Sequence, residues 1–383
     1  MNYAAPRYGS ASLADVAPAL LDALGVRGTN PFGFEPARRA CLLLIDGLGF
    51  DLLHSRRDVA PFLASVASRE PIDAAFPTTT AASLASLTTG RPPGEHGLLG
   101  PTVALPGSDR PMNVLKWRLH GVGPSVDLID VVPPERFQPV PTVLELASAA
   151  GLNPVTLGPS EHDRSGLSRA VLRGAAHVAI SSLSELVDST ARTLLSSACR
   201  FVYAYHGSLD QVGHREGVAS ERWVDELSRV DAAVNALAER LPGDTLLVAV
   251  GDHGMVDVDD EGFIDVAKDP VLLDGVRVLA GEPRLRHVHV AAGAGHDVLE
   301  TWQERLGDLA CIMSREQTVA EGWFGPVVSD AARARIGDVV AAAYPGAAIV
   351  QSDLDPMQTD LVGHHGSLTD AERHVPLVVV RKS

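Results

Sequence analysis

Carboxylate and imidazole side chains stand at the ends of several apolar segments of this sequence, where they could bind metal ions. Asp and His offer the oxygen and nitrogen atoms that Zn²⁺ accepts, and no Cys-x-x-Cys spacing adds thiolates. Three carboxylates and three imidazoles would hold two divalent ions with three ligands each, Zn²⁺ first, with Mn²⁺ or Fe²⁺ as alternatives. The candidate ligands are Asp46, Asp210, His214, Asp252, His253 and His365.

Each of these motifs also has a plain structural interpretation. An Asp-Gly after an apolar segment, such as Asp46-Gly47, is common at turns and helix caps. Asp210 and His214 are four residues apart and would share one face of a helix, which suits a metal ion but also a surface pair. The combination of all six side chains favours a metal site more than any one of them does.

A threonine-rich segment, residues 76–83, provides a candidate nucleophile in Thr80. The segment precedes a helical pattern that reaches Thr88, and capping that helix is the ordinary role for such a hydroxyl. A helix N-terminus also offers N–H groups to a phosphate, and a bound metal ion can lower the pKa of a hydroxyl enough to make it nucleophilic. Thr80 is therefore the candidate catalytic residue.

Short apolar segments bounded by turn residues predict the strands that would position these side chains. Most are uninterrupted, which is typical of strands buried on both faces, and the helical patterns between them suit crossovers in a mainly parallel sheet. We therefore predict the α/β class, with ligands at the carboxyl edge of the sheet. The strands are expected at 40–45, 72–76, 154–157, 177–180, 201–205, 246–250 and 376–380, and the helices at 51–68, 143–150, 183–197 and 220–241.

Two stretches depart from this pattern. Residues 97–140 are rich in Gly and Pro with little periodicity, and we expect long loops there over one end of the sheet. Residues 260–350 predict a small inserted α/β cap subdomain, so the catalytic core would comprise residues 1–259 and 351–383. Within the subdomain we expect strands near 276–280, 286–290 and 310–312 and a helix near 297–306.

Charge and composition narrow the choice of partners. The formal net charge of −16 disfavours a nucleic-acid polymer, and a small phosphate-ester substrate would depend on the local charge of bound metal ions. No stretch approaches the 18 apolar residues of a membrane span, and residues 1–26 lack the pattern of a signal peptide. We therefore expect a cytoplasmic protein without membrane contact.

Taken together, the motifs resemble those of the type I phosphodiesterase and nucleotide pyrophosphatase branch of the alkaline phosphatase superfamily. Residues 76–97, FPTTTAASLASLTTGRPPGEHG, contain that branch's Pro-Thr-x-Thr run, later Thr-Gly and closing His-Gly, and LLLIDGLG, DQVGH, GDHG and HHG keep its chain order. The resemblance covers about residues 40–383. It implies an alkaline-phosphatase-like three-layer α/β/α fold with a mainly parallel central sheet.

The resemblance also implies roles for individual residues. The last threonine of the first run, Thr80, would be the nucleophile, and its attack would give a phosphothreonine intermediate that water hydrolyses. The family's division of ligands gives one metal ion Asp210, His214 and His365, and gives the other Asp46, Asp252, His253 and the Thr80 oxygen.

The residues that follow Thr80 indicate which type of phosphate ester bond would be cleaved. Monoesterases of this superfamily need an added cation, often an arginine, whereas Thr80 is followed by Ala-Ala-Ser, so we expect a diester or pyrophosphate bond. The family's phosphate-binding asparagine after His-Gly is replaced by residues 98–102, LLGPT. Asn113, further along the same loop, is the candidate substrate-binding donor.

Two alternatives stay open at this stage. One is a phosphomonoesterase or phosphonate hydrolase of the same superfamily, and the other is a non-catalytic metal-binding domain. A sulfatase is disfavoured because the chain has no Cys-x-Pro-x-Arg sequence.

Overall fold

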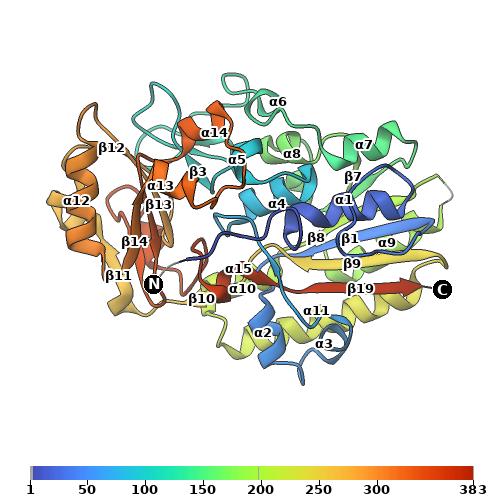
Figure 1. Cartoon of the computed structure of the whole chain (residues 1–383). Coiled ribbons are helices and arrows are strands. Elements are labelled where there is room, and N and C mark those ends of the chain that lie inside the picture. The colour runs from blue at the N-terminus through green and yellow to red at the C-terminus, as the bar shows by residue number, and fades with distance from the viewer. Residues whose placement is uncertain (1–2, 197, 383) are drawn as a thin grey trace.

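A six-stranded sheet forms the centre of the computed structural model, which describes residues 3–196 and 198–382. Five neighbouring strands run parallel, and the last strand of the chain pairs antiparallel at one edge. The predicted α/β class with a mainly parallel sheet is confirmed (Figure 1). The order is β19 (Leu377–Lys382), β9 (Thr245–Gly251), β1 (Arg39–Ile45), β8 (Phe201–His206), β6 (Val155–Gly158) and β7 (Ala176–Ala179).

Helices cover both faces of this sheet and complete three layers. Alternate residues of β1 point to opposite faces, so Leu42 and Leu44 enter one apolar cluster while Leu43 and Ile45 enter the other. The first cluster is covered by α1 (Leu13–Ala23), α4 (Thr80–Thr89) and α7 (Val143–Ala149), and the second by α3 (Pro61–Val66), α9 (Leu183–Leu195) and α11 (Glu221–Arg240).

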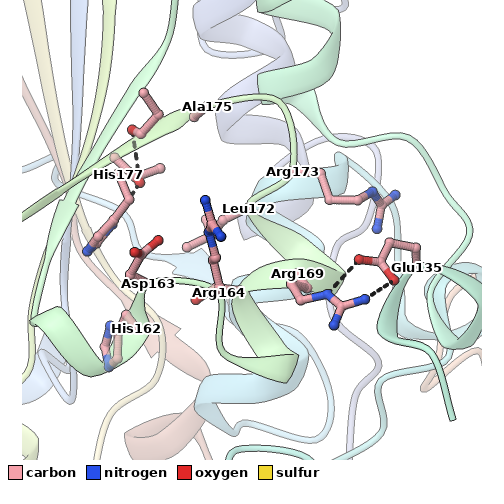
Figure 2. Close-up of a pocket in the computed structure, with 12 residues that line it drawn as sticks. Glu135, His162, Asp163, Arg164, Arg169, Leu172, Arg173, Ala175 and His177 are labelled. Carbon is pink, nitrogen blue, oxygen red and sulfur yellow. Dashed lines mark hydrogen bonds and ion pairs between the residues drawn. The ribbon is translucent and has the colours of Figure 1, made fainter. Parts of the chain in front are cut away.

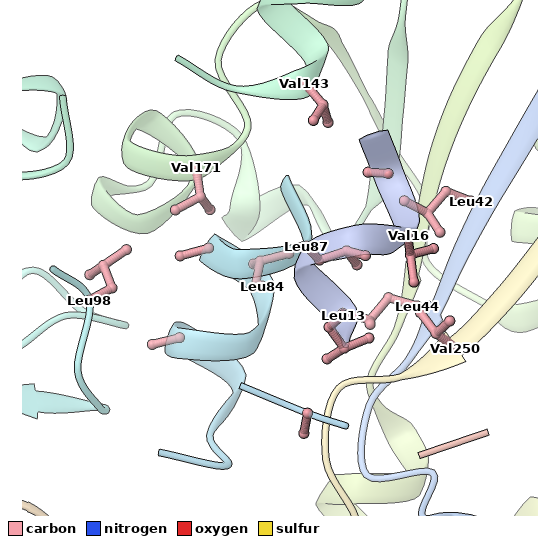
Figure 3. Packing of buried hydrophobic residues seen from close by; sticks show 14 of the residues in the cluster. Leu13, Val16, Leu42, Leu44, Leu84, Leu87, Leu98, Val143, Val171 and Val250 are labelled. Atoms are coloured by element: carbon pink, nitrogen blue, oxygen red, sulfur yellow. The ribbon is translucent and has the colours of Figure 1, made fainter. Parts of the chain in front are cut away.

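The packing of α4 against the sheet fixes the position of Thr80, the candidate nucleophile. Leu84 and Leu87 of α4 lie beside Leu13 of α1, over the strand residues Leu42 and Leu44 (Figure 3). All five side chains are at most 6% exposed. Their burial holds the N-terminal end of α4 at a constant place relative to the strand ends.

Several predicted elements differ in extent. The single helix predicted over 51–68 is wrong: the chain forms α2 (Phe50–Ser55) and then α3, because Pro61 has no N–H to continue a helix and instead begins one. The strand predicted at 72–76 shrinks to β2 (Ile72–Asp73), which pairs with β18 (His374–Val375) outside the central sheet. The helix predicted to reach Ser197 ends at Leu195, and Ser197 lies outside the described residues.

The stretch at 97–140 contains more regular structure than predicted. It forms a three-stranded antiparallel sheet and a short helix, α6 (Pro134–Phe137). The strands have two residues each, too short for any periodicity to show in the sequence. They are β3 (Thr102–Val103), β4 (Met112–Asn113) and β5 (Arg118–Leu119).

A second, antiparallel sheet lies beside the central one, on the left of Figure 1. Its one face packs against Trp302 and Leu306 of α12 (Gly295–Leu306), while Val340 and Ala342 on its other face belong to the apolar cluster that continues from the central sheet. The two sheets thus share a core, and the predicted subdomain limits of 260 and 350 stay a prediction. The strands, in order, are β12 (Val276–Glu282), β13 (Leu285–Val290), β15 (Val339–Ala343) and β14 (Ala310–Ser314).

Among the described helices, none has both the length and the apolar character needed to cross a membrane.

Candidate active site

Adjacent strand ends bring two of the candidate ligands together. In the parallel ladder of β1 and β9, Ile45 lies opposite Gly251, and these are the last residues of their strands. Asp46 and Asp252 are the next residues along the chain. Both carboxylates therefore stand at the carboxyl edge of the sheet, where α/β proteins bind ligands.

The strand on the other side of β1 supplies two more ligands through a helix. β8 leads into α10 (Ser208–Glu216), on which Asp210 and His214 lie one turn apart. Gly47 allows the loop after β1 to approach this helix, because a Cβ on Gly47 would lie 3.1 Å from the Cβ of Asp210 and its φ is +76°.

His365 reaches the same edge from the end of the chain. It follows β17 (Gly363–His364), which pairs with β10 (Val256–Asp257) beyond the end of β9. The segment is also bonded to the threonine-rich loop, since the Gly366 N–H donates to Thr78 Oγ1 at 3.0 Å. The positions of His365 and of the threonine run are therefore coupled.

The six candidate ligands form two groups of three, within each of which the ligand atoms lie within 4.8 Å of one another. In the first group, His214 Nε2 lies 3.4 Å from Asp210 Oδ1 and 3.3 Å from His365 Nε2. In the second, His253 Nε2 lies 3.4 Å from Asp46 Oδ1 and 3.5 Å from Asp252 Oδ2. These groups have the same members as the division that the resemblance implies.

Each of the three imidazoles is oriented by a backbone carbonyl. A carbonyl oxygen lies about a hydrogen-bond length from every Nδ1, so Nδ1 carries the proton and the Nε2 lone pair faces the other ligands. Burial, together with the neighbouring imidazoles, lowers the pKa of His365 well below its ordinary value and keeps the ring neutral, as metal binding requires. The contacts are His214 to Gly363 at 2.8 Å, His253 to Gly254 at 3.0 Å and His365 to Thr78 at 2.9 Å.

Each of the three candidate carboxylate ligands has one buried oxygen without a hydrogen-bond partner among the described residues: Asp46 Oδ1, Asp210 Oδ1 and Asp252 Oδ2. Burial first, and then the charges of Asp252 and Asp210, raise the pKa of Asp46 well above its usual range. Unpaired carboxylate oxygens at this depth are costly unless a cation faces them. The donor set therefore fits two divalent cations.

In Asp46 and Asp252 the protein holds the other carboxylate oxygen. The Tyr205 hydroxyl donates to Asp46 Oδ2 at 2.6 Å, and the Gly47 and His253 N–H groups donate to Asp252 Oδ1 at 3.0 and 3.1 Å. Tyr205 was missed from the sequence, since nothing about an inward-facing strand tyrosine marks it as a ligand's partner.

Thr80 is the first residue of α4, which places its hydroxyl beside the second ligand group. Thr79 caps the helix by accepting a bond from the Ala82 N–H at 3.4 Å. Thr80 Oγ1 lies 3.4 Å from His253 Nε2. It lines one cavity of about 420 Å³ together with Asp46 and another of about 330 Å³ that contains the first ligand group.

Asn113 and Lys116 stand on the walls of these cavities. Asn113 lines the cavity of about 330 Å³, and its Oδ1 accepts a bond from the Lys116 N–H at 2.9 Å, which leaves the amide NH₂ to face a ligand. Lys116 lines the cavity of about 420 Å³ and is the sole Lys or Arg among the residues that line either of the two. Lys116 was not singled out in the sequence.

His96, which closes the motif after the nucleophile, lies outside both ligand groups. It accepts a bond from the Leu98 N–H at Nδ1 and contacts Ser86 Oγ at 2.9 Å through Nε2. Burial lowers its pKa to about 3. The ring therefore ties α4 to the following loop as a neutral side chain.

A further cavity of about 310 Å³ adjoins the site, sharing His162, Ser168 and Leu172 with the larger Thr80 cavity. Figure 2 shows Arg169 on its wall in a bidentate pair with Glu135, at 2.8 and 3.0 Å. None of the six ligands lines it, so the candidate active site is confined to the two cavities that Thr80 lines.

Comparisons with known proteins give one family match and several similar folds. The family model described as type I phosphodiesterase/nucleotide pyrophosphatase matches residues 40–368. The fold is similar to that of murine ectonucleotide pyrophosphatase/phosphodiesterase 5, with a TM-score of 0.69 and 16% identity over 90% of this chain and 88% of that one. It is also similar to phosphonoacetate hydrolase from Sinorhizobium meliloti 1021 in complex with phosphonoformate, with a TM-score of 0.65 and 16% identity over 90% of both chains.

Sequence relatives match over a shorter stretch. The catalytic subunit of human GPI ethanolamine phosphate transferase 3 is 38% identical over 63 residues, which are 16% of this chain. The matched part spans 6% of the length of that relative. The whole relative is therefore much longer than the shared segment.

Proposed function

This chain belongs to the type I phosphodiesterase and nucleotide pyrophosphatase family of hydrolases, and we propose that it cleaves phosphodiester or pyrophosphate bonds of small molecules with Thr80 as the nucleophile. One observation carries the proposal: the Thr80 hydroxyl oxygen lies 3.4 Å from His253 Nε2. Thr80 is the first residue of α4, and it lines two cavities to which both ligand groups contribute residues. A hydroxyl, two sets of metal ligands and a helix N-terminus are the parts that phosphoryl transfer needs.

Two divalent ions complete the proposed site, Zn²⁺ first, with Mn²⁺ or Fe²⁺ as alternatives because oxygen and nitrogen ligands suit all three. When bound, they would lower the pKa of the Thr80 hydroxyl and stabilise negative charge on the oxygens around phosphorus. The proposed ligands are Asp210, His214 and His365 for one ion, and Asp46, Asp252, His253 and the Thr80 oxygen for the other.

The reaction proposed for the chain's own residues has two displacements. Thr80 Oγ attacks phosphorus, the bond from phosphorus to the leaving oxygen breaks, and a phosphothreonine forms, while the proton that the hydroxyl gives up passes through solvent to the leaving oxygen. Water then attacks phosphorus, the bond to Thr80 Oγ breaks, and a proton from that water restores the hydroxyl. The first N–H groups of α4 and the free amide NH₂ of Asn113 would donate hydrogen bonds to the phosphoryl oxygens.

A second candidate, hydrolysis of phosphomonoesters or phosphonates, is favoured by one feature. Lys116 lines the Thr80 cavity and offers a positive charge for the additional negative charge of those substrates. A diester stays the first choice because Lys116 is exposed, and no Lys or Arg follows Thr80 directly in the helix.

Replacing Thr80 tests this function. Thr80→Ala should abolish cleavage of an aryl phosphodiester and leave the circular dichroism spectrum unchanged, while Thr80→Ser retains a hydroxyl and should retain measurable turnover. Thr88→Ala, eight residues along the same helix, is the matched control and should cleave at close to the normal rate. Full activity in Thr80→Ala would refute the proposed nucleophile.

Location and partners are part of the proposal as well. The charge of −16 supports a small phosphate ester over a nucleic-acid polymer as the partner. A cytoplasmic location is likewise proposed from the sequence. Fractionation of cells that express the tagged chain tests the location, and recovery outside the cytoplasm would contradict it.

A further inference from the structure

A carboxylate from the second sheet stands behind one of the candidate metal ligands. Glu282 is the last residue of β12, and its Oε2 lies 3.4 Å from Nδ1 of His365. The opposite nitrogen, His365 Nε2, faces His214 Nε2 at 3.3 Å and Asp210 Oδ1 at 3.8 Å. Glu282 also lines the cavity of about 330 Å³, and it meets His365 at the nitrogen opposite the one that faces the other two ligands. It is therefore placed to act on the His365 ring.

This carboxylate is buried without an obvious structural reason. Glu282 is 8% exposed, and its Oε1 has no hydrogen-bond partner within residues 3–196 and 198–382. The two buried guanidiniums in its vicinity are committed elsewhere, Arg284 to Glu372 at 2.6 Å and Arg286 to Gln358 at 2.6 Å.

Among the described residues, Glu282 instead contacts the neutral ring of His365, which does not compensate a negative charge as a cation would. A buried carboxylate that is incompletely paired opposes folding, so the stability of the fold alone would favour a neutral side chain at this position. Its presence calls for another explanation.

The residue after His365, Gly366, leaves room for the Glu282 carboxylate. Gly366 has a φ of +132°, and a Cβ on it would lie 2.8 Å from both Cδ and Oε1 of Glu282. Any larger residue at 366 would therefore displace either the carboxylate or the segment that carries His365. Both sides of the contact are built for a carboxylate behind the ring.

We propose that Glu282 is a positioning residue for the ligand group of Asp210, His214 and His365. The Thr78 carbonyl accepts the Nδ1 proton of His365 at 2.9 Å, and the Glu282 carboxylate lies 3.4 Å from the same nitrogen. Negative charge behind a ligating imidazole holds the ring and increases electron donation from Nε2 to the ion. Because Glu282 belongs to β12, the second sheet becomes part of the metal centre. The inference deepens the proposed function and rests on it for the kinetic readout, whereas its metal-binding readout is independent of any substrate.

Zinc binding to Glu282→Gln tests the inference. The full chain is freed of metal with a chelator and titrated with Zn²⁺ in competition with a chromophoric chelator. We expect the affinity of one of two sites to fall about 10- to 100-fold while the other is unchanged. Excess Zn²⁺ should restore diester cleavage by the variant. The metal-free variant should melt at or above the Tm of the metal-free parent, since an incompletely hydrogen-bonded buried carboxyl group is removed.

The matched control is Glu304→Gln, which changes an exposed glutamate on α12 and should leave both affinities intact. Unchanged affinities in Glu282→Gln, or equal losses at both sites, would overturn the inference. If the Glu282→Gln chain does not fold, the second variant is Glu282→Met, which has a side chain of similar length without either oxygen. The same changes in the two zinc affinities are expected, and the same results would overturn the inference. A parent chain that binds two Zn²⁺ but cleaves no diester would refute the proposed function and leave the role of Glu282 standing.

Discussion

The hydroxyl of Tyr205 donates a hydrogen bond of 2.6 Å to Oδ2 of Asp46. Tyr205 lies on β8, beside β1, so the bond joins two adjacent strands where they reach the active-site edge. It leaves Oδ1 of the same carboxylate 3.4 Å from His253 Nε2. One oxygen of Asp46 is thus fixed by the protein while the other is directed at the position of a cation.

Removing this hydroxyl should weaken the metal centre without unfolding the chain. In Tyr205→Phe we expect the metal affinity of the group that contains Asp46, and kcat with it, to fall about 10- to 100-fold. Tyr203→Phe is the matched control, because Tyr203 lies two residues earlier on β8 and its hydroxyl has no hydrogen-bond partner among the described residues. Metal titration checks both variants, and equal behaviour would count against the role of Tyr205.

Lys116 should influence which esters are preferred. We expect Lys116→Ala to lower kcat/KM for an aryl phosphomonoester about fivefold more than for the matching diester, which corresponds to roughly 1 kcal/mol for an exposed ion pair. The measurement is the ratio of the two kcat/KM values. Arg91→Ala, at an exposed position just after α4, is the control that should leave the ratio unchanged. Equal losses on both substrates would show that Lys116 does not sense the additional charge.

His96 should make the fold sensitive to acid. Its pKa is about 3 in the folded chain, because of burial, against 6.5 for an exposed histidine. Between pH 3 and pH 6.5 the unfolded chain binds more protons than the folded one. The contribution of His96 to the free energy of unfolding is therefore fully present above about pH 6.5 and is lost as the pH falls toward 3.

The test compares metal-free parent and His96→Gln chains by denaturant unfolding from pH 7 to pH 4. The free energy of unfolding of the variant should fall less steeply with decreasing pH, by up to about 1.4 kcal/mol per pH unit. Identical slopes would mean that His96 does not contribute in this range.

The buried pair of Arg284 and Glu372 should be important for stability. Neither side chain is exposed, and their atoms lie 2.6 Å apart. We expect Glu372→Gln to lower the free energy of unfolding by about 3–5 kcal/mol, because Arg284 would be left buried and unpaired. Glu316→Gln, in an exposed pair with Arg333, should cost less than about 1 kcal/mol. Thermal and denaturant unfolding measure both, and similar small effects would contradict the prediction.

The candidate ligands could be anticipated from their places after predicted strands, whereas their division into two groups came from the family resemblance. Asp46 and Asp252 directly follow uninterrupted apolar strands, and parallel neighbours end at one edge of a sheet. Tyr205 and Glu282 could not be anticipated in the same way. Each contacts a candidate ligand on a different strand or segment, and no local spacing in the sequence indicates that contact.

The helices and strands were predictable where the apolar pattern in the sequence is long, and less so where contacts with neighbouring elements determine the secondary structure. The helix α1 was not predicted, since Pro18 lies within it and proline ordinarily interrupts a helix. β15, with the sequence VVAAA, was missed because alanine has little strand propensity, although the strand is buried at the centre of the second sheet. In both cases burial against neighbouring elements overrides the local signal.

The stereochemical course at phosphorus tests the covalent role of Thr80 most directly. A phosphorothioate diester of known configuration is hydrolysed in ¹⁸O-labelled water, and the configuration of the product is determined. Two in-line displacements, first by Thr80 and then by water, predict net retention of configuration. Inversion would show that water attacks the substrate directly and would contradict a phosphothreonine intermediate.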